Sequence, residues 1–143
     1  MNPIEVLLVE DSEADAVMVK ETLLDSKLKM NLNVVHDGVE AMHYLQRKGK
    51  YQQQRTPDLI ILDLNLPKKD GREVLAEIKE DDRIKQIPVV VLTTSSAEED
   101  IVRSYKLHAN CYITKPLDFD QFAKIVASIE SFWFTIAKLP PIT

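Results

Sequence analysis

Five short runs of apolar residues recur along the chain, and more polar segments separate them. The run at 59–62 contains no polar residue, and an uninterrupted apolar run is typical of a strand that is buried on both faces of a sheet. The runs are rich in β-branched residues, which favour strands. We therefore predict five strands, at residues 4–9, 32–35, 59–62, 89–92 and 111–113.

The segments between these runs have apolar residues at helical spacing, which predicts helices. In the first helix, Val17 and Leu24 are seven residues apart and Ala14 and Met18 are four apart, as on one face of a helix. Asp118 fits the N-cap of the last helix. The predicted helices lie at residues 14–24, 39–45, 74–78 and 97–105, and the last one begins near residue 118.

Strands that alternate with helices predict a parallel sheet with helices on both faces, because parallel strands need crossover connections. The fold class is therefore α/β, a doubly wound (βα)5 arrangement around a five-stranded parallel sheet. The flavodoxin-like strand order 2-1-3-4-5 fits five such units, although periodicity alone does not give the order. A length of 143 residues suits one domain. Within it we expect a core at about residues 4–131, with a surface loop or an extended helix end at 47–57.

Composition and charge argue against several classes of protein. The chain is 45% hydrophobic and 29% charged, as in ordinary globular proteins, and has no apolar run long enough to span a membrane. Its net charge of −5 and its 18 scattered Lys and Arg residues argue against nucleic acid as a direct partner. Cys111 is the only cysteine, so no internal disulfide can form. The start of the chain lacks the features of a secretory signal, and we expect a cytoplasmic protein.

Polar residues follow four of the predicted strands at their carboxyl ends. Glu10 and Asp11 follow the first strand, Asp63 the third, Thr93 the fourth and Lys115 the fifth. In a parallel sheet these ends lie at one edge, where ligands bind in open α/β folds. We therefore expect three carboxylates, a hydroxyl and an ammonium group to converge in one small region.

This combination of groups indicates phosphoryl chemistry. Carboxylates held close together repel one another unless a proton or a cation compensates them. Mg²⁺ fits because it needs only one or two carboxylates besides phosphate oxygens, and Mn²⁺ can substitute for it. Lys115 adds a charge suited to a phosphoryl oxygen, and Thr93 adds a hydroxyl donor. A carboxylate such as that of Asp63, beside Mg²⁺, can act as a nucleophile and form an aspartyl-phosphate.

Each of these residues also has an ordinary structural explanation. Asp63 could form a turn, Ser12 could cap the first helix, and Ser96 could cap the fourth. Lys115 alone could be a solvated surface charge. Capping does not explain, however, why all four signals fall at corresponding strand ends.

The chain resembles the receiver domain of bacterial two-component response regulators. The resemblance covers nearly the whole chain and rests on the ordered motifs VLLVEDSEAD, ILDLNLPKKDGREVL, PVVVLTTSS and CYITKPLD. It implies a protein that takes a phosphoryl group from a sensor histidine kinase and signals by changing conformation. Such a protein is not an enzyme in the usual sense, because it catalyses only its own phosphorylation and dephosphorylation.

The resemblance also implies roles for the acidic residues. Asp63 would be the phosphoacceptor. Mg²⁺ would bind to Asp11 most directly, with Glu10, Asp63 and the backbone carbonyl of Asn65 as further ligands.

A second group of residues would bind the phosphoryl group and switch. Thr93 would hydrogen-bond the phosphoryl group, and Lys115 would pair with its oxygens. Tyr112 would be the aromatic residue that changes rotamer, and a cis peptide bond would precede Pro116. Thr94 departs from the family, which often has a smaller residue there, and could slow the access of water or phosphodonor to the site.

Further segments look much like the single-domain regulators that are paired with bacterial phytochromes. These segments are NLPKKDGREVLAEIK, VVVLTTSSAEEDI, NCYITKPLD and IESFWFTIAKLPP. The resemblance implies that the phosphodonor is a phytochrome-type histidine kinase.

The end of the chain, residues 132–143, is apolar nearly all round, which a helix packed on one face of a sheet does not require. Exposed apolar surface of this kind usually marks an interface. We therefore predict a homodimer in which this extension contacts the partner subunit; the alternative is a tail that folds back on its own core. The candidate contact residues are Phe132, Trp133, Phe134, Ile136 and Leu139.

Two other functions compete with the signalling switch. One is a Mg²⁺-dependent phosphohydrolase that passes through an aspartyl-phosphate, but the residue two positions after the nucleophile is Asn65 rather than a second acid, and no inserted cap is evident. The other is an interaction module that is never phosphorylated, which the intact acidic set disfavours.

Overall fold

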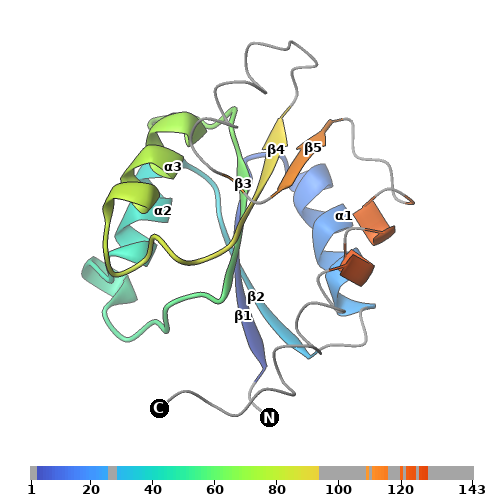
Figure 1. The fold of residues 1–143 in the computed structure, drawn as a ribbon, viewed down its shortest axis with the longest axis horizontal. Coiled ribbons are helices and arrows are strands. Elements are labelled where there is room, and N and C mark those ends of the chain that lie inside the picture. The colour runs from blue at the N-terminus through green and yellow to red at the C-terminus, as the bar shows by residue number, and fades with distance from the viewer. Residues whose placement is uncertain are drawn as a thin grey trace.

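The structure is a computed structural model, and it describes residues 3–25, 29–93, 109, 111–115, 120, 122–124 and 126–128. Its centre is one parallel sheet with the strand order β2-β1-β3-β4-β5 (Figure 1). This confirms the predicted α/β class and the predicted order. The strands are β1 (Ile4–Val9), β2 (Met30–Val35), β3 (Leu59–Asp63), β4 (Val89–Thr93) and β5 (Cys111–Thr114).

Three of the strands end one residue beyond their apolar runs, at Asp63, Thr93 and Thr114. The backbone ladder continues past Asp63 and Thr93. Leu64 donates a hydrogen bond to the Leu92 carbonyl at 2.9 Å, and Lys115 donates one to the Thr93 carbonyl at 2.7 Å. The sheet therefore holds the backbone of the polar residues as firmly as that of the apolar ones.

The helices begin where polar side chains cap them. Ser12, Asp37 and Asp70 each accept a hydrogen bond from a backbone N–H of the first turn that follows. The described helices are α1 (Glu13–Leu24), α2 (Gly38–Leu45), the 3-10 helix η1 (Gly49–Tyr51) and α3 (Gly71–Glu80). Residues 122–124 and 126–128 are also helical, whereas the fourth predicted helix and Asp118 lie outside the described residues.

The sheet separates two hydrophobic cores, because successive side chains point to opposite faces. In β3, Ile60 packs in the core beneath α2 and α3, and Ile61 packs in the core beneath α1. Phe122 and Val126 of the last helical segment also belong to the second core. Figure 1 shows α2 and α3 on one face of the sheet and α1 on the other.

The face of α1 that Val17 and Leu24 mark is exposed rather than buried. Val17 and Leu24 are 52% and 64% exposed, and the residues that pack on the sheet are Val19 and Leu23. Apolar residues occur on all sides of this helix, so their spacing did not identify the buried side. Thr22, also buried, satisfies its hydroxyl by donating to the Met18 carbonyl at 2.8 Å.

The connection between α2 and β3 is the loop that the sequence predicts at residues 47–57, and it contains η1. Arg47 and Gly49 both have positive φ angles, which end α2 and turn the chain. The Tyr51 hydroxyl hydrogen-bonds to the Glu40 carboxylate, and its ring lies 5.1 Å from that of Tyr44. The loop is thus anchored on α2. Within the described part of the chain, no helix is long and apolar enough to cross a membrane.

Candidate functional site

Strand register brings the polar residues of the three central strands together. Val9 of β1 pairs with Leu62 of β3, so Glu10 and Asp63 follow side by side on neighbouring strands. On the other side of β3, Asp63 pairs with Leu92 of β4. The carboxyl ends of β1, β3 and β4 therefore meet at one edge of the sheet, as the sequence predicts.

The turn after β3 approaches the site so closely that it requires glycine. The Gly71 N–H donates to the Leu64 carbonyl at 3.0 Å, and a Cβ at this position would lie only 2.3 Å from the Asp63 carbonyl oxygen. Asp63 itself takes part in the turn, because its Oδ1 accepts a hydrogen bond from the Asn65 N–H at 2.9 Å. The ordinary turn-forming explanation thus accounts for one oxygen of Asp63 but not for the other.

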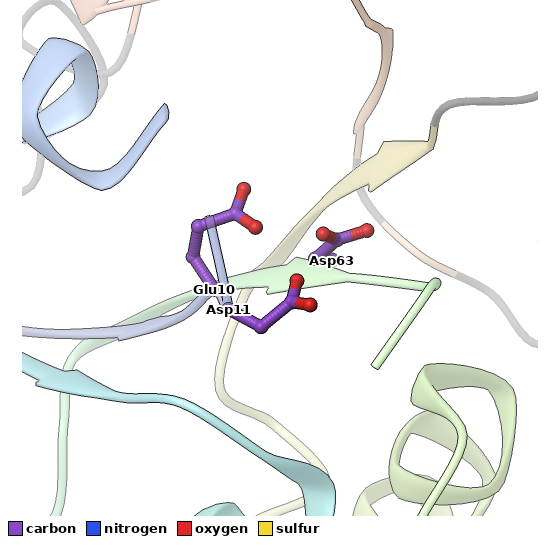
Figure 2. Close-up of side chains that lie close together, drawn as sticks. All are labelled: Glu10, Asp11 and Asp63. Atoms are coloured by element: carbon purple, nitrogen blue, oxygen red, sulfur yellow. The ribbon is translucent and has the colours of Figure 1, made fainter. Parts of the chain in front are cut away.

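Three carboxylates form an acidic cluster at this edge (Figure 2). Glu10, Asp11 and Asp63 each place one carboxylate oxygen within 4.8 Å of the others. Glu10 and Asp63 are almost fully buried, whereas Asp11 is exposed. The cluster therefore has a buried side within the protein and an open side toward solvent.

Lys115 lies within this cluster and supplies its positive charge. Its Nζ is 3.0 Å from Oδ2 of Asp63 and 2.5 Å from Oε1 of Glu10. It also lies 2.8 Å from Oδ2 of Asp15, in the first turn of α1. Lys115 is only 9% exposed, so the interpretation of a solvated surface charge is excluded.

Burial and charge shift the pKa values of the two most enclosed groups. Burial raises the pKa of Glu10 to about 7, and the neighbouring Asp63 adds to this effect, while Lys115 opposes it. Burial acts to lower the pKa of Lys115, but the carboxylates of Asp15, Glu10 and Asp63 outweigh it and hold that pKa above its usual value. At neutral pH Lys115 therefore carries its positive charge, while Glu10 is close to half protonated.

One buried oxygen of this cluster has no hydrogen bond to the described residues. Oε1 of Glu10 lies at ion-pair distance from Lys115, yet it accepts no hydrogen bond from this group or from any other described group. Buried polar atoms are rarely left in this state, and a bound ion is one common reason. Together with the three converging carboxylates, this oxygen fits a hard divalent cation with oxygen ligands.

A family model described as the response regulator receiver domain matches residues 6–127. The chain belongs to this family. Receiver domains are a family of signalling proteins, and phosphoryl acceptance is the property that the family implies.

The receiver domain is similar to response regulators of phytochromes. It is 53% identical to the response regulator Rcp1 of Synechocystis sp. over 96% of this chain and 94% of that protein. It also matches the crystal structure of the phosphorylated cyanobacterial phytochrome response regulator RcpA, with 53% identity and a TM-score of 0.85 over 98% of this chain and 100% of that one. The structure of the Mn²⁺-bound form of Rcp1 matches with 52% identity and a TM-score of 0.84, over 97% of this chain and 100% of that one.

The remaining predicted residues of the receiver site differ in how far the structure describes them. Thr93 is buried at the end of β4, and Tyr112 of β5 is partly buried against the core beneath α2 and α3. Asn65 lies in the turn after β3, and it is exposed. Outside the described residues lie Thr94, Pro116 and the candidate dimer contacts Phe132, Trp133, Phe134, Ile136 and Leu139.

Sequence reasoning did not include Asp15 in the site. A signal was present, because Asp15 comes one helical turn after Asp11 and so tends to lie on the same side of the chain. That spacing alone did not show that the Asp15 side chain would reach the ammonium group of Lys115, which is distant in the sequence. Only the packing of α1 against the sheet brings Asp15 to Lys115.

Proposed function

We propose that this receiver domain accepts a phosphoryl group on Asp63 from a sensor histidine kinase, in a Mg²⁺-dependent reaction, and signals by changing conformation. One observation carries the proposal. The Asp63 carboxylate is buried to 1% exposure, with an ammonium group 3.0 Å from Oδ2 and two further carboxylates beside it. A structural aspartate does not need both an ammonium group and a cation site.

The phosphoryl transfer uses Oδ2 of Asp63 as the nucleophile, because Oδ2 faces the Lys115 ammonium group that would pair with a phosphoryl oxygen, whereas Oδ1 accepts from the Asn65 N–H in the turn. The new bond forms between Oδ2 and phosphorus, while the bond from phosphorus to the imidazole nitrogen of the kinase histidine breaks. The bonding electron pair stays with that nitrogen, and the imidazole returns to its neutral form. The product is an aspartyl-phosphate and a free histidine.

Negative charge on the phosphoryl oxygens is the main obstacle to this transfer, and it is met by positioned cations. Lys115 would pair with one phosphoryl oxygen, and Thr93 would donate its hydroxyl to another. The metal ion, held by Asp11, Glu10, Asp63 and the Asn65 carbonyl, would neutralise the remaining charge. The cluster of carboxylate oxygens supports this ligand set.

The response to phosphorylation would pass through β4 and β5. Thr93 ends β4 next to the acceptor strand and pairs in register with Thr114, one residue before Lys115. A shift of Thr93 toward the phosphoryl group would therefore alter the packing beside Tyr112, which we propose as the rotameric switch. The smaller roles given to Thr94 and to a cis bond before Pro116 stay predictions.

The proposed phosphodonor is a phytochrome-type histidine kinase. The similarity to Rcp1 and RcpA over nearly the whole chain supports it, because both are full-length matches rather than matches to a shared core. To test it, the protein would be offered to a set of phosphorylated histidine kinases from its own organism. Transfer to this chain that is fastest from the phytochrome-type kinase supports the pairing, and equal or slower transfer from it rejects the pairing.

The phosphoacceptor itself is tested by intact mass after incubation with Mg²⁺ and a small-molecule phosphodonor. Asp63→Asn removes the nucleophile, and Asp82→Asn is the matched control, because Asp82 is an exposed aspartate at 89% side-chain exposure. We expect the mass of one labile phosphoryl group on the wild type and on Asp82→Asn, and none on Asp63→Asn.

Three other results would contradict the proposal. Addition that persists in Asp63→Asn would place the phosphoryl group elsewhere. Repeated turnover of phosphate esters would indicate the phosphohydrolase instead. No addition under any condition, with the protein folded, would indicate an interaction module.

A further inference from the structure

Lys115 is shared by more negative groups than it can neutralise. Glu10, Asp15 and Asp63 all lie within ion-pair distance of its Nζ, and Asp11 belongs to the same acidic cluster. All three carboxylates lie on one ammonium group, at 2.5, 2.8 and 3.0 Å. Any new anion in the site must compete with them for Lys115.

Asp15 differs from the other carboxylates in where it comes from. Glu10, Asp11 and Asp63 follow strands of the sheet and form the cluster that fits a metal ion, whereas Asp15 belongs to α1. Its side chain is 26% exposed, and its backbone N–H donates to the hydroxyl of Ser12, the N-cap of α1. The carboxylate is therefore attached to a fixed helix end and reaches into the site from the side.

We propose that Asp15 is a positioning residue that acts through Lys115. It draws the ammonium group toward α1, away from the two carboxylates that the metal ion needs, and it competes with a phosphoryl group for the same ammonium. This inference rests on the proposed function, because it assumes that Asp63 takes the phosphoryl group.

The charge balance gives the direction of each effect. Without the negative charge of Asp15, Lys115 would pair more strongly with Glu10 and Asp63 and would compete better with Mg²⁺ for them. After phosphorylation, the single charge of Asp63 is replaced by nearly two charges on the phosphoryl group. In a protein without the Asp15 charge, the phosphoryl group would have one competitor fewer for Lys115. Loss of Asp15 should thus weaken metal binding and strengthen phosphoryl binding.

Opposite effects of this kind distinguish positioning from damage. A substitution that merely loosened α1 or misplaced the site would weaken the binding of both ligands. The control is Glu13→Gln, because Glu13 lies in the same first turn, is exposed, and would lose the same charge at the same helix terminus. The charge of Glu13 acts on Lys115 only at long range, and salt at physiological ionic strength screens it.

The experiment measures two affinities by calorimetry for the wild type, Asp15→Asn, Glu13→Gln and Asp63→Asn. The probes are Mg²⁺ alone, and beryllofluoride, a mimic of the phosphoryl group, at saturating Mg²⁺. For Asp15→Asn we expect Mg²⁺ to bind about threefold more weakly and beryllofluoride about threefold more tightly, which is the scale of one partly exposed ion pair. For Glu13→Gln both affinities should stay close to those of the wild type.

The two proposals fail in different ways. If the wild type does not bind beryllofluoride, or if Asp63→Asn binds it equally well, the proposed function is wrong and this inference falls with it. If the wild type binds it and Asp63→Asn does not, the function stands. In that case, Asp15→Asn behaving like Glu13→Gln, or losing affinity for both probes, overturns the role of Asp15 alone.

Discussion

Replacing Lys115 with methionine tests the charge balance of the site most directly. Methionine has a similar length and fills the space of the lysine stem, but it removes the positive charge. Glu10 and Asp63 are 0% and 1% exposed, so both would remain as buried carboxylates without their nearest cation. The substitution therefore leaves negative charge uncompensated inside the protein.

The expected cost follows from the burial of these partners. Removal of one member of a buried ion pair typically destabilises a protein by about 3–5 kcal/mol. Glu10 limits the cost, because burial already raises its pKa to about 7 and the group can take up a proton instead. In the metal-free protein at pH 8 we therefore expect the free energy of unfolding to fall by about 3 kcal/mol, at the low end of that range.

Mg²⁺ should restore most of the stability that Lys115→Met loses. The ion compensates the carboxylates of Glu10 and Asp63, and in this variant it no longer competes with an ammonium group for them. Mg²⁺ stabilises the wild type as well, so the deficit of Lys115→Met changes only by the difference in Mg²⁺ affinity between the two proteins. We expect the variant to bind Mg²⁺ about thirtyfold more tightly, which would reduce the deficit from about 3 to about 1 kcal/mol at saturating Mg²⁺.

The assay is urea denaturation followed by circular dichroism, once with a chelator and once with Mg²⁺. Lys124→Met serves as the control, because Lys124 is exposed. It should change the free energy of unfolding by less than about 0.5 kcal/mol in both conditions. The reasoning is refuted if Lys115→Met costs no more than this control in chelator, or if its deficit is the same with and without Mg²⁺.

Three further predictions concern the turn, the pH dependence and the tail. Gly71→Ala should destabilise the protein by about 2–3 kcal/mol in urea denaturation, because the new Cβ would lie 2.3 Å from a backbone atom of the acceptor strand. Gly49→Ala should cost only about 1 kcal/mol, because this position has open space and the only strain comes from its φ of +58°. Equal costs for the two variants would contradict this. The raised pKa of Glu10 means that the folded state binds this proton more tightly than the unfolded state does. As the pH rises from 4.5 to about 7, the free energy of unfolding of the metal-free protein should therefore fall by up to about 3 kcal/mol relative to that of Glu10→Gln. A difference between the two proteins that does not change with pH would rule this out. Truncation after Ile129 should convert the predicted homodimer to a monomer in light scattering, and an unchanged mass would remove the tail from the interface.

The sequence by itself determined where the strands lie, which polar residues stand at their carboxyl ends, and which three carboxylates form the acidic cluster. Long apolar runs between polar segments have few other solutions than buried parallel strands, and parallel strands place their carboxyl ends at one edge. Glu10, Asp11 and Asp63 could therefore be grouped before any coordinates were known, and the structure confirms that their oxygens converge.

The tertiary structure decided how the helices face the sheet and which groups share a charge. The apolar residues of α1 surround the helix, so only packing shows that Val19 is buried and Val17 exposed. For the same reason the contact between Asp15 and Lys115 could not be predicted, since it joins a helix to the end of a distant strand. Periodicity describes neighbours along the chain, whereas the balance of charge around Asp63 depends on groups that only folding brings within ion-pair distance.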